Sequence, residues 1–166
     1  MSYSDGWPFQ KAVPGVDARS GARNAKLAIT QRMEVLARVP LFAGLSKRQR
    51  QALARVCSSR CWPAESRVVV EGSNDQFCFI IVEGTVDVHR AGRRIAHLGP
   101  GEFFGEIALL DPGPRSATVT TTSEVLAVEL SRKAFVDVAA GDPKLLLGML
   151  EALARRLREA TEKVSY

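Results

Sequence analysis

A short segment in the second half of the sequence carries residues that suit recognition of a phosphate. Gly105 opens the run 106–110, which is long enough for one helical turn. The first N–H groups of a helical turn have no partner inside it and lie at the positive end of its dipole, so they attract an anion. Arg115 follows across a Pro-Gly-Pro turn, and its planar guanidinium can complete the same anion site with two parallel hydrogen bonds.

Glu106 needs a separate explanation, because a carboxylate repels a negatively charged ligand. A carboxylate accepts hydrogen bonds and cannot donate them, which suits the hydroxyl group of a neighbouring sugar. A phosphate beside a ribose indicates a nucleotide, and Ser116 adds a short hydroxyl to the site. The structural alternative is that Glu106 caps a helical turn and pairs with Arg115 on the protein surface.

Short strands are expected on both sides of this segment and must position it. After Cys57, runs rich in Val, Ile, Phe and Thr are separated by turns that contain Gly and Asp. Six or more short strands at this spacing indicate an antiparallel sandwich or barrel. The runs are 66–71, 77–83, 85–90, 93–98, 117–122 and 125–130.

Helices are expected before and after the strands. An apolar pattern over 30–39 predicts a short helix that ends before Pro40, and Ser46 with Gln49 forms a capping box that begins a second helix. Ser131 can cap a third helix through residue 138.

The last helix should begin at Asp142, with Pro143 at its first position. One apolar stripe follows at spacings of four and three residues, and such a stripe is typical of core packing. Its length and terminal position also leave open a lid or a contact between two protomers. The stripe consists of Leu146, Leu150, Leu153, Leu157 and Ala160.

Composition and charge exclude several classes of protein. The chain has 166 residues, 46% hydrophobic and 25% charged, which is an ordinary globular mixture rather than a disordered or fibrous one. No apolar run approaches a membrane span, and no signal peptide is apparent, so we expect a cytoplasmic protein without membrane contact. The net charge of +5 divides into +8 over residues 1–60 and −3 over the remainder. The basic character therefore belongs to the N-terminal third of the chain.

Metal binding has little support in the sequence. The three cysteines, Cys57, Cys61 and Cys78, are interpreted as reduced structural thiols, because an odd number cannot all pair. A zinc site would need four ligands at workable spacing, and only His89 and His97 could join them. We therefore expect no metal and no cofactor.

The phosphate segment closely resembles the phosphate-binding cassette of the cyclic nucleotide-binding domain family. That module occurs in catabolite-activator-type regulators, cyclic-nucleotide-gated channels and regulatory subunits of cyclic-AMP-dependent protein kinase. The resemblance covers about residues 40–158, and its most specific part is FGEIALL followed by PRSATV. It implies an α+β, mainly β fold, in which an antiparallel β-roll or jelly-roll sandwich is flanked by N-terminal helices and a C-terminal lid helix.

The resemblance also assigns expected roles to individual residues. The residue matching Glu106 accepts from the ribose 2′-hydroxyl, and Gly105 lets the backbone approach the ligand. Backbone amides and the matching arginine hold the cyclic phosphate, so the expected phosphate and ribose site is Gly105, Glu106, Ile107, Ala108, Arg115, Ser116 and Ala117. A threonine in place of Ser116 favours guanine in the family, so cyclic AMP is the expected ligand and cyclic GMP stays open. The expected base pocket and lid residues are Val88, Leu98, Phe104, Leu157 and Arg158.

The resulting expectation is a non-enzymatic sensor or regulatory module for signal transduction. Its expected parts are a flexible basic tail at 1–28, helices at 29–57, a β-roll at 58–130 with the cassette at 101–119, and helices at 131–164. The ligand would rearrange the C-terminal helix. One alternative is a β-roll that has lost its ligand and serves as a protein–protein interaction domain. The other is a metal-dependent enzyme of the cupin type, but such an enzyme needs clustered histidines and this sequence contains no His-x-His pair. A protein partner or sister domain at the basic N-terminal region and a homodimer stay open, whereas a nucleic acid is not expected as a partner.

Overall fold

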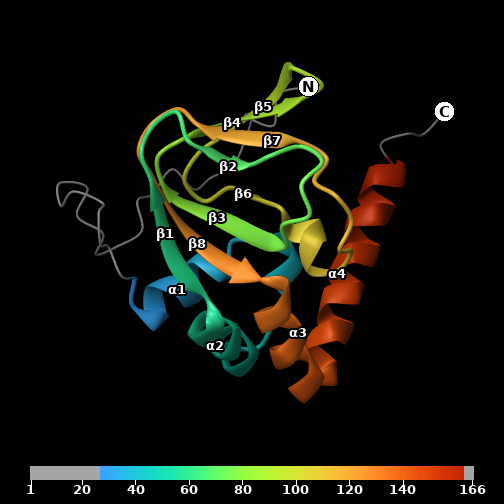
Figure 1. Ribbon diagram of the computed structural model, residues 1–166. Coiled ribbons are helices and arrows are strands. Elements are labelled where there is room, and N and C mark those ends of the chain that lie inside the picture. Colours follow the sequence, from blue (N-terminus) through green and yellow to red (C-terminus); the bar gives the residue numbers. More distant parts are fainter. Residues whose placement is uncertain (1–26, 163–166) are drawn as a thin grey trace.

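Two four-stranded antiparallel sheets face each other at the centre of the structure, a computed structural model that describes residues 27–162 (Figure 1). The predicted tail at 1–28 lies almost wholly outside the described residues. The first sheet has the order β1 (Ser58–Trp62), β8 (Val125–Ser131), β3 (Phe77–Glu83) and β6 (Phe103–Phe104). The second has the order β2 (Arg67–Val69), β7 (Thr118–Thr121), β4 (Val86–Arg90) and β5 (Arg93–Leu98).

The predicted fold class is confirmed. All six predicted strands are present, and the strands predicted at 77–83 and 93–98 have the predicted bounds. The two strands that the sequence patterns did not predict are β1 and β6. Both belong to the first sheet and form its two edges.

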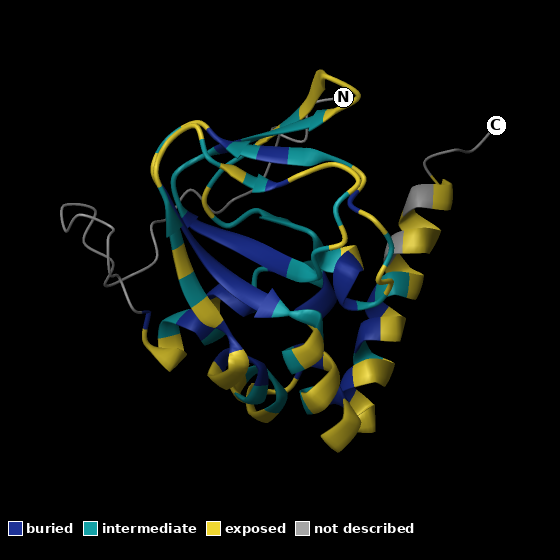
Figure 2. Ribbon diagram, viewed as in Figure 1, coloured by how far each residue is buried: buried dark blue, intermediate teal, exposed yellow. Residues whose placement is uncertain are grey.

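The central strands β3 and β8 are buried on both faces (Figure 2). Alternate residues of β3 therefore enter two different cores. Cys78, Ile80 and Val82 belong to the cluster that the helices cover, whereas Phe79 and Ile81 belong to the cluster between the two sheets. This double burial explains why 77–82 is a nearly continuous apolar run rather than an alternating one.

Helices cover the outer face of the first sheet. The N-terminal ones are α1 (Ile29–Leu36), the short 3-10 helix η2 (Pro40–Phe42) and α2 (Lys47–Val56), and the C-terminal ones are α3 (Arg132–Gly141) and α4 (Pro143–Glu162). The predicted caps are confirmed: the Ser46 side chain accepts from the Gln49 amide, and the Ser131 side chain accepts from the Ala134 amide. The Asp142 carboxylate accepts from the Lys144 amide at the start of α4.

One buried cation, Arg32 of α1, holds the N-terminal helices α1 and α2 together. Its Nη1 donates to the carbonyl oxygens of Ala54 and Cys57, at 3.2 and 2.8 Å. These carbonyls lie at the end of α2, where helical carbonyls lack partners within the helix. Part of the positive charge of the N-terminal third is therefore structural and is not available to a partner.

The packing face of α4 differs from the predicted stripe, and the prediction of core packing was wrong. The buried residues of α4 are Leu145, Met149 and Ala152, which join the core beneath the first sheet. The predicted stripe lies one residue further round the helix and is largely exposed. Its exposed fractions are 39% for Leu146, 61% for Leu150 and 69% for Leu157. Only Leu153 of this stripe packs partly against the core, and the side chain of Ala160 is not among those described.

Candidate functional site

The predicted phosphate segment forms a tight helical turn that begins at Gly105. The 3-10 helix η3 (Glu106–Leu109) follows it, and Gly105 itself has a left-handed backbone with φ of 80°. A Cβ atom at this position would lie 2.6 Å from the carbonyl oxygen of Phe77 and would overlap Nη1 of Arg115. Glycine is therefore required twice over, by conformation and by the close approach of Arg115.

The expected anion site uses the backbone amides of Ile107 and Ala108, and these two amides differ in their hydrogen bonding. The first N–H groups of a short helix find no acceptor inside it, which leaves the Ile107 amide free within the turn. The Ala108 amide differs from the expectation, because it donates to the carbonyl oxygen of Gly105 at 3.1 Å. Ile107 is 55% exposed and Ala108 is 6% exposed, so the outer side of the turn is open and its inner side is packed.

Arg115 reaches the same place and is almost wholly buried, at 8% exposure. Its Nε donates to Oδ1 of Asp75 at 2.8 Å, and its Nη2 donates to Asp75 and to the carbonyl oxygen of Phe77. Its main chain is also fixed, because the Arg115 amide donates to the Ser73 carbonyl and its carbonyl accepts from the Gly72 amide, both at 2.8 Å. Arg115 therefore pairs with Asp75 and not with Glu106, which was the structural alternative.

Asp75 is the site residue that sequence reasoning missed. Partial burial alone would raise the pKa of its carboxyl group, but the hydrogen bonds from Arg115 and Ser73 hold that pKa below its ordinary value. The Ser73 hydroxyl donates to the second carboxylate oxygen at 2.9 Å. The sequence signal was the polar turn 73–75, which indicated a loop but gave no reason to pair it with a residue 40 positions away.

Glu106 lies at the start of η3 and is half-buried. Within residues 27–162 its carboxylate has no hydrogen-bond or ion-pair partner. It is close enough to the buried thiol of Cys78 to help raise the pKa of that thiol, although burial is the larger cause. An acceptor without a donor beside a helical N-terminus and an arginine suits a ligand that brings both a negative charge and a hydroxyl group.

Ser116 and Ala117 complete the segment after Arg115. Ser116 is exposed and Ala117 is half-buried. The carbonyl oxygen of Ser116 accepts from Nε of Arg90 at 3.1 Å, so the end of β4 holds this part of the backbone. The seven predicted phosphate and ribose residues therefore lie on the turn 105–108 and on the loop segment 115–117 that leads into β7, and Arg115 brings the two together at Gly105.

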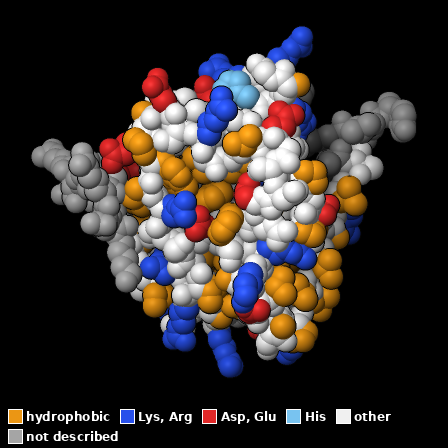
Figure 3. Space-filling view, viewed as in Figure 1, with side chains coloured by type: hydrophobic (Ala, Val, Ile, Leu, Met, Phe, Trp, Pro, Cys, Tyr) orange, Lys and Arg blue, Asp and Glu red, His pale blue; other side chains and the backbone are white. Residues whose placement is uncertain are grey.

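The predicted base-pocket residues Val88, Leu98 and Phe104 all pack against the cluster between the sheets. They are half-buried, unlike the fully buried members of that cluster, and hydrophobic side chains gather on the face shown in Figure 3. An aromatic row adjoins them: the rings of Phe79 and Phe104 are stacked with centroids 5.2 Å apart, and Phe77 stacks on Phe79 at 6.1 Å. This apolar wall suits a flat heterocycle.

The two predicted lid residues are not part of this wall. Leu157 and Arg158 lie on the last turns of α4, where both are exposed. Their role stays a prediction.

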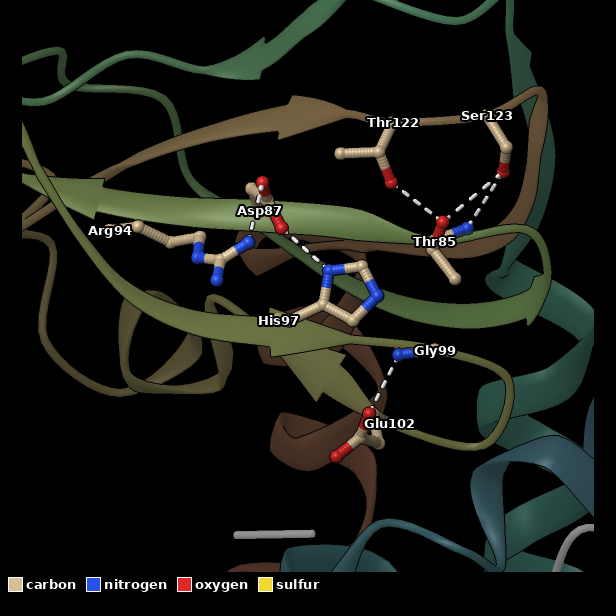
Figure 4. Close-up of polar contacts among 8 residues, drawn as sticks. All are labelled: Thr85, Asp87, Arg94, His97, Gly99, Glu102, Thr122 and Ser123. Carbon is tan, nitrogen blue, oxygen red and sulfur yellow. Dashed lines mark hydrogen bonds and ion pairs between the residues drawn. The ribbon is translucent and has the colours of Figure 1, made fainter. Parts of the chain in front are cut away.

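The two histidines do not form a metal site in the part of the chain that the structure describes. No cluster of three or more His, Cys, Asp or Glu side chains suited to a metal occurs among residues 27–162. His97 instead lies on the outer face of the second sheet, where its Nδ1 is 2.6 Å from Oδ1 of Asp87, and Arg94 approaches the other carboxylate oxygen at 3.6 Å (Figure 4). The pKa of Asp87 is lowered, chiefly by the hydrogen bond with His97. Cys57 and Cys78 carry buried free thiols, and burial raises the pKa of Cys57 to about 12.

Comparison with known proteins gives one consistent family. A CRP-like cAMP-activated global transcriptional regulator of Mycobacterium tuberculosis is 34% identical over 137 residues, covering 80% of this chain and 61% of the relative. The N-terminal domain of a transcriptional regulator from Streptomyces coelicolor has a TM-score of 0.72 and 34% identity, covering 80% of this chain and 96% of that one. The regulatory domain of Toxoplasma gondii PKA, solved with cAMP, has a TM-score of 0.63 and 28% identity, covering 66% of this chain and 44% of that one.

The match with the Mycobacterium relative covers only part of that protein. The chain spans less than two thirds of the length of the Mycobacterium relative. No helix among the described residues has the length and apolar character needed to cross a bilayer. Residues 59–142 match the family described as the cyclic nucleotide-binding domain. This match, the two-sheet fold and the convergence of Gly105, Glu106 and Arg115 show that the chain belongs to the cyclic nucleotide-binding domain family.

Proposed function

We propose that this domain binds cyclic AMP, with cyclic GMP as a weaker ligand, and acts as a regulatory module rather than an enzyme. The observation that carries the proposal is the contact between the Arg115 guanidinium and Gly105 at the start of η3, beside a Glu106 carboxylate that has no partner among the described residues. The phosphate would meet the η3 amides and Arg115, and Glu106 would accept from the ribose hydroxyl.

The charges at this site favour a cyclic phosphate over a phosphate monoester. Asp75 already matches the positive charge of Arg115, and Glu106 adds a negative charge nearby. A phosphate monoester carries about −1.5 to −2 at neutral pH, whereas a cyclic phosphodiester carries a single charge. Repulsion from Glu106 and Asp75 therefore penalises the monoester more than the cyclic form.

The preference for adenine depends on Ser116. Its position after Arg115 places a short hydroxyl, and not a threonine, beside the phosphate segment, and threonine is the residue associated with guanine in this family. The half-buried wall of Val88, Leu98 and Phe104 would contact the base. The terminal helix α4 would then close over it, and that movement would be the regulatory output.

Titration calorimetry with cyclic AMP, cyclic GMP and 5′-AMP tests the proposal. We expect saturable heat with cyclic AMP, a weaker response with cyclic GMP and none with 5′-AMP at the same concentrations. The absence of heat for both cyclic nucleotides up to about 1 mM, where binding free energy is about −4 kcal/mol, would reject the proposal. Equal affinity for 5′-AMP would reject the charge argument while leaving the site in place.

The exposed stripe of α4 supports a protein contact as a second candidate function. Leu146, Leu150 and Leu157 repeat at four and seven residues, which suits a second helix, and we propose pairing of two copies of this chain through that face. Sedimentation equilibrium of the whole chain tests the pairing: we expect a dimer that Leu150→Lys converts to a monomer. A wild-type chain that stays monomeric at about 100 µM, where a Kd near 1 µM would give mostly dimer, would reject it.

The basic N-terminal third is proposed as a separate contact for an acidic partner or a sister domain. Lys47, Arg48 and Arg55 are exposed on α2, and Figure 3 shows Lys and Arg side chains along the lower edge of the molecule, where α2 lies. None of the three has an acidic partner within residues 27–162.

A further inference from the structure

Arg132 joins the phosphate turn to the C-terminal helices through a single polar contact. It is the first residue of α3, and its Nη1 donates to the carbonyl oxygen of Leu109, the last residue of η3, at 2.6 Å. Carbonyl groups at the end of a helical turn lack partners inside it and lie at its negative end, so a cation is well suited to this position. Arg132 therefore caps the end of η3 opposite to the end that faces the proposed phosphate.

The main chain of Arg132 is anchored next to the contacts of Arg115. The Arg132 amide donates to the carbonyl oxygen of Gln76 at 2.8 Å. The residues on either side of Gln76 are Asp75 and Phe77, and both accept hydrogen bonds from Arg115. The three consecutive residues 75–77, which lead into β3, thus hold Arg115 and the start of α3 together.

The stability of α3 alone does not explain an arginine here. The side chain of Ser131 already caps α3, and a cation in the first turn of a helix lies at the positive end of its dipole, where it is unfavourable. The next residue, Lys133, is an ordinary surface cation, 87% exposed and paired with Asp137 four positions later. The long side chain of Arg132 instead turns away from its own helix to reach η3.

The inner side of η3 also packs against α3 and α4, at the same residue that accepts the hydrogen bond from Arg132. Leu109 is 1% exposed and belongs to the same core cluster as Phe135 of α3 and Leu145 and Met149 of α4. The apolar packing and the hydrogen bond from Arg132 therefore act on the same residue. Release of the Leu109 carbonyl would leave η3 held to α3 by apolar contacts that do not fix its orientation.

We propose that Arg132 is a positioning residue of the phosphate site, which holds η3 so that its amides face the ligand and makes η3 and the start of α3 move as one unit. The inference rests on the proposed function for its ligand, but its structural part concerns the ligand-free protein.

Three single variants of the whole chain separate this role from general stability. Arg132→Met keeps the apolar stem and removes every donor, and Arg132→Lys keeps the positive charge and an N–H donor group, the ammonium, without the planar fork of the guanidinium. Lys133→Met is the matched control, because it removes a neighbouring charge from the same turn without touching η3. Amide hydrogen exchange over residues 106–111, cyclic AMP affinity and the thermal midpoint are measured for each.

In the ligand-free protein we expect Arg132→Met to speed exchange over 106–111 by about tenfold, the scale set by loss of one hydrogen bond to a charged group. Lys133→Met should leave this exchange unchanged. With cyclic AMP, Arg132→Met should raise Kd about tenfold, and Arg132→Lys should restore it to within about threefold.

Two results would overturn the proposal. The first is unchanged exchange over 106–111 in the free Arg132→Met protein. The second is a lower thermal midpoint with wild-type affinity for cyclic AMP, which is the signature of a purely structural residue. A wild-type chain that fails to bind cyclic AMP would reject the proposed function instead, and the exchange comparison in the free protein would still decide whether Arg132 positions η3.

Discussion

The phosphate end of the candidate site and the outer face of α4 differ in how far their side chains are buried and held by other residues. At the phosphate end, Arg115 is 8% exposed and is held by Asp75 and the Phe77 carbonyl, while Gly105 admits it at close range. On α4, by contrast, Leu150 and Leu157 are 61% and 69% exposed. The first region is assembled before any ligand arrives, whereas the second presents apolar surface without a described partner.

This difference indicates that the two regions have different roles, one in ligand binding and the other in the response to the ligand. Groups that are already ordered lose little conformational freedom on binding, so a preassembled phosphate end gives affinity at low entropic cost. A helix with an uncovered apolar face can instead change its neighbours with little loss of core packing, because its adjacent face remains in the core. We interpret the phosphate end as the fixed receptor and the outer face of α4 as the responsive surface.

Substitutions on the two faces of α4 should give the largest contrast in stability. Met149 is 1% exposed in the core, so Met149→Ala should lower the free energy of unfolding by about 2–5 kcal/mol. Leu150 lies on the outer face, so Leu150→Ala should change it by less than about 0.5 kcal/mol in the monomer, at protein concentrations too low for the proposed pairing of two copies. Urea denaturation of both variants provides the measurement. A comparable loss for Leu150→Ala at these low concentrations would show that the outer face is already packed within the monomer.

Removal of the phosphate arginine should give the largest effect on binding. Arg115→Ala leaves the ligand charge without its cation and should weaken cyclic AMP binding by about 2–4 kcal/mol, measured by calorimetry. Lys133→Met serves as the control and should bind normally, because the Lys133 side chain is 87% exposed and pairs with Asp137. An unchanged affinity for Arg115→Ala would mean that the phosphate lies elsewhere.

The strands and the phosphate turn were largely predictable from the sequence for local reasons. Both are set by residue types within a few positions: the apolar run of β3, the turn between β4 and β5, and the glycine before η3. The edge strand β1 was missed because SSRCW shows no apolar alternation, and β6 because two residues form no pattern.

The features that were missed depend on tertiary contacts. Helix α4 is apolar on two adjacent faces, and periodicity alone favoured the longer stripe over Leu145 and Met149, which the core actually takes. Asp75 was read only as part of a turn, because its partner Arg115 is 40 residues away. In both cases the deciding contacts are made with distant parts of the chain, which local residue patterns do not reveal.

The pairing of Asp75 with Arg115 gives a smaller, pH-dependent effect. Since the folded pKa of Asp75 is lowered, its contribution to stability is complete above its ordinary pKa of 3.8 and is lost as the pH falls through the lower folded value. At pH 7, Asp75→Asn should lower the free energy of unfolding by about 1–2 kcal/mol. The difference from wild type should shrink in acid, which urea denaturation at pH 7 and near pH 3 would measure. A difference that is the same at both pH values would contradict the ion-pair account.

The amide chemical shifts of the η3 turn test the central claim most directly. In a titration of the ¹⁵N-labelled chain with cyclic AMP, we predict that the largest shifts fall on Gly105, Ile107 and Ala108, and that Arg115→Ala abolishes them at the same ligand concentration. Saturable shifts centred on another part of the roll, with the Gly105–Ala108 amides unmoved, would contradict the proposed position of the phosphate.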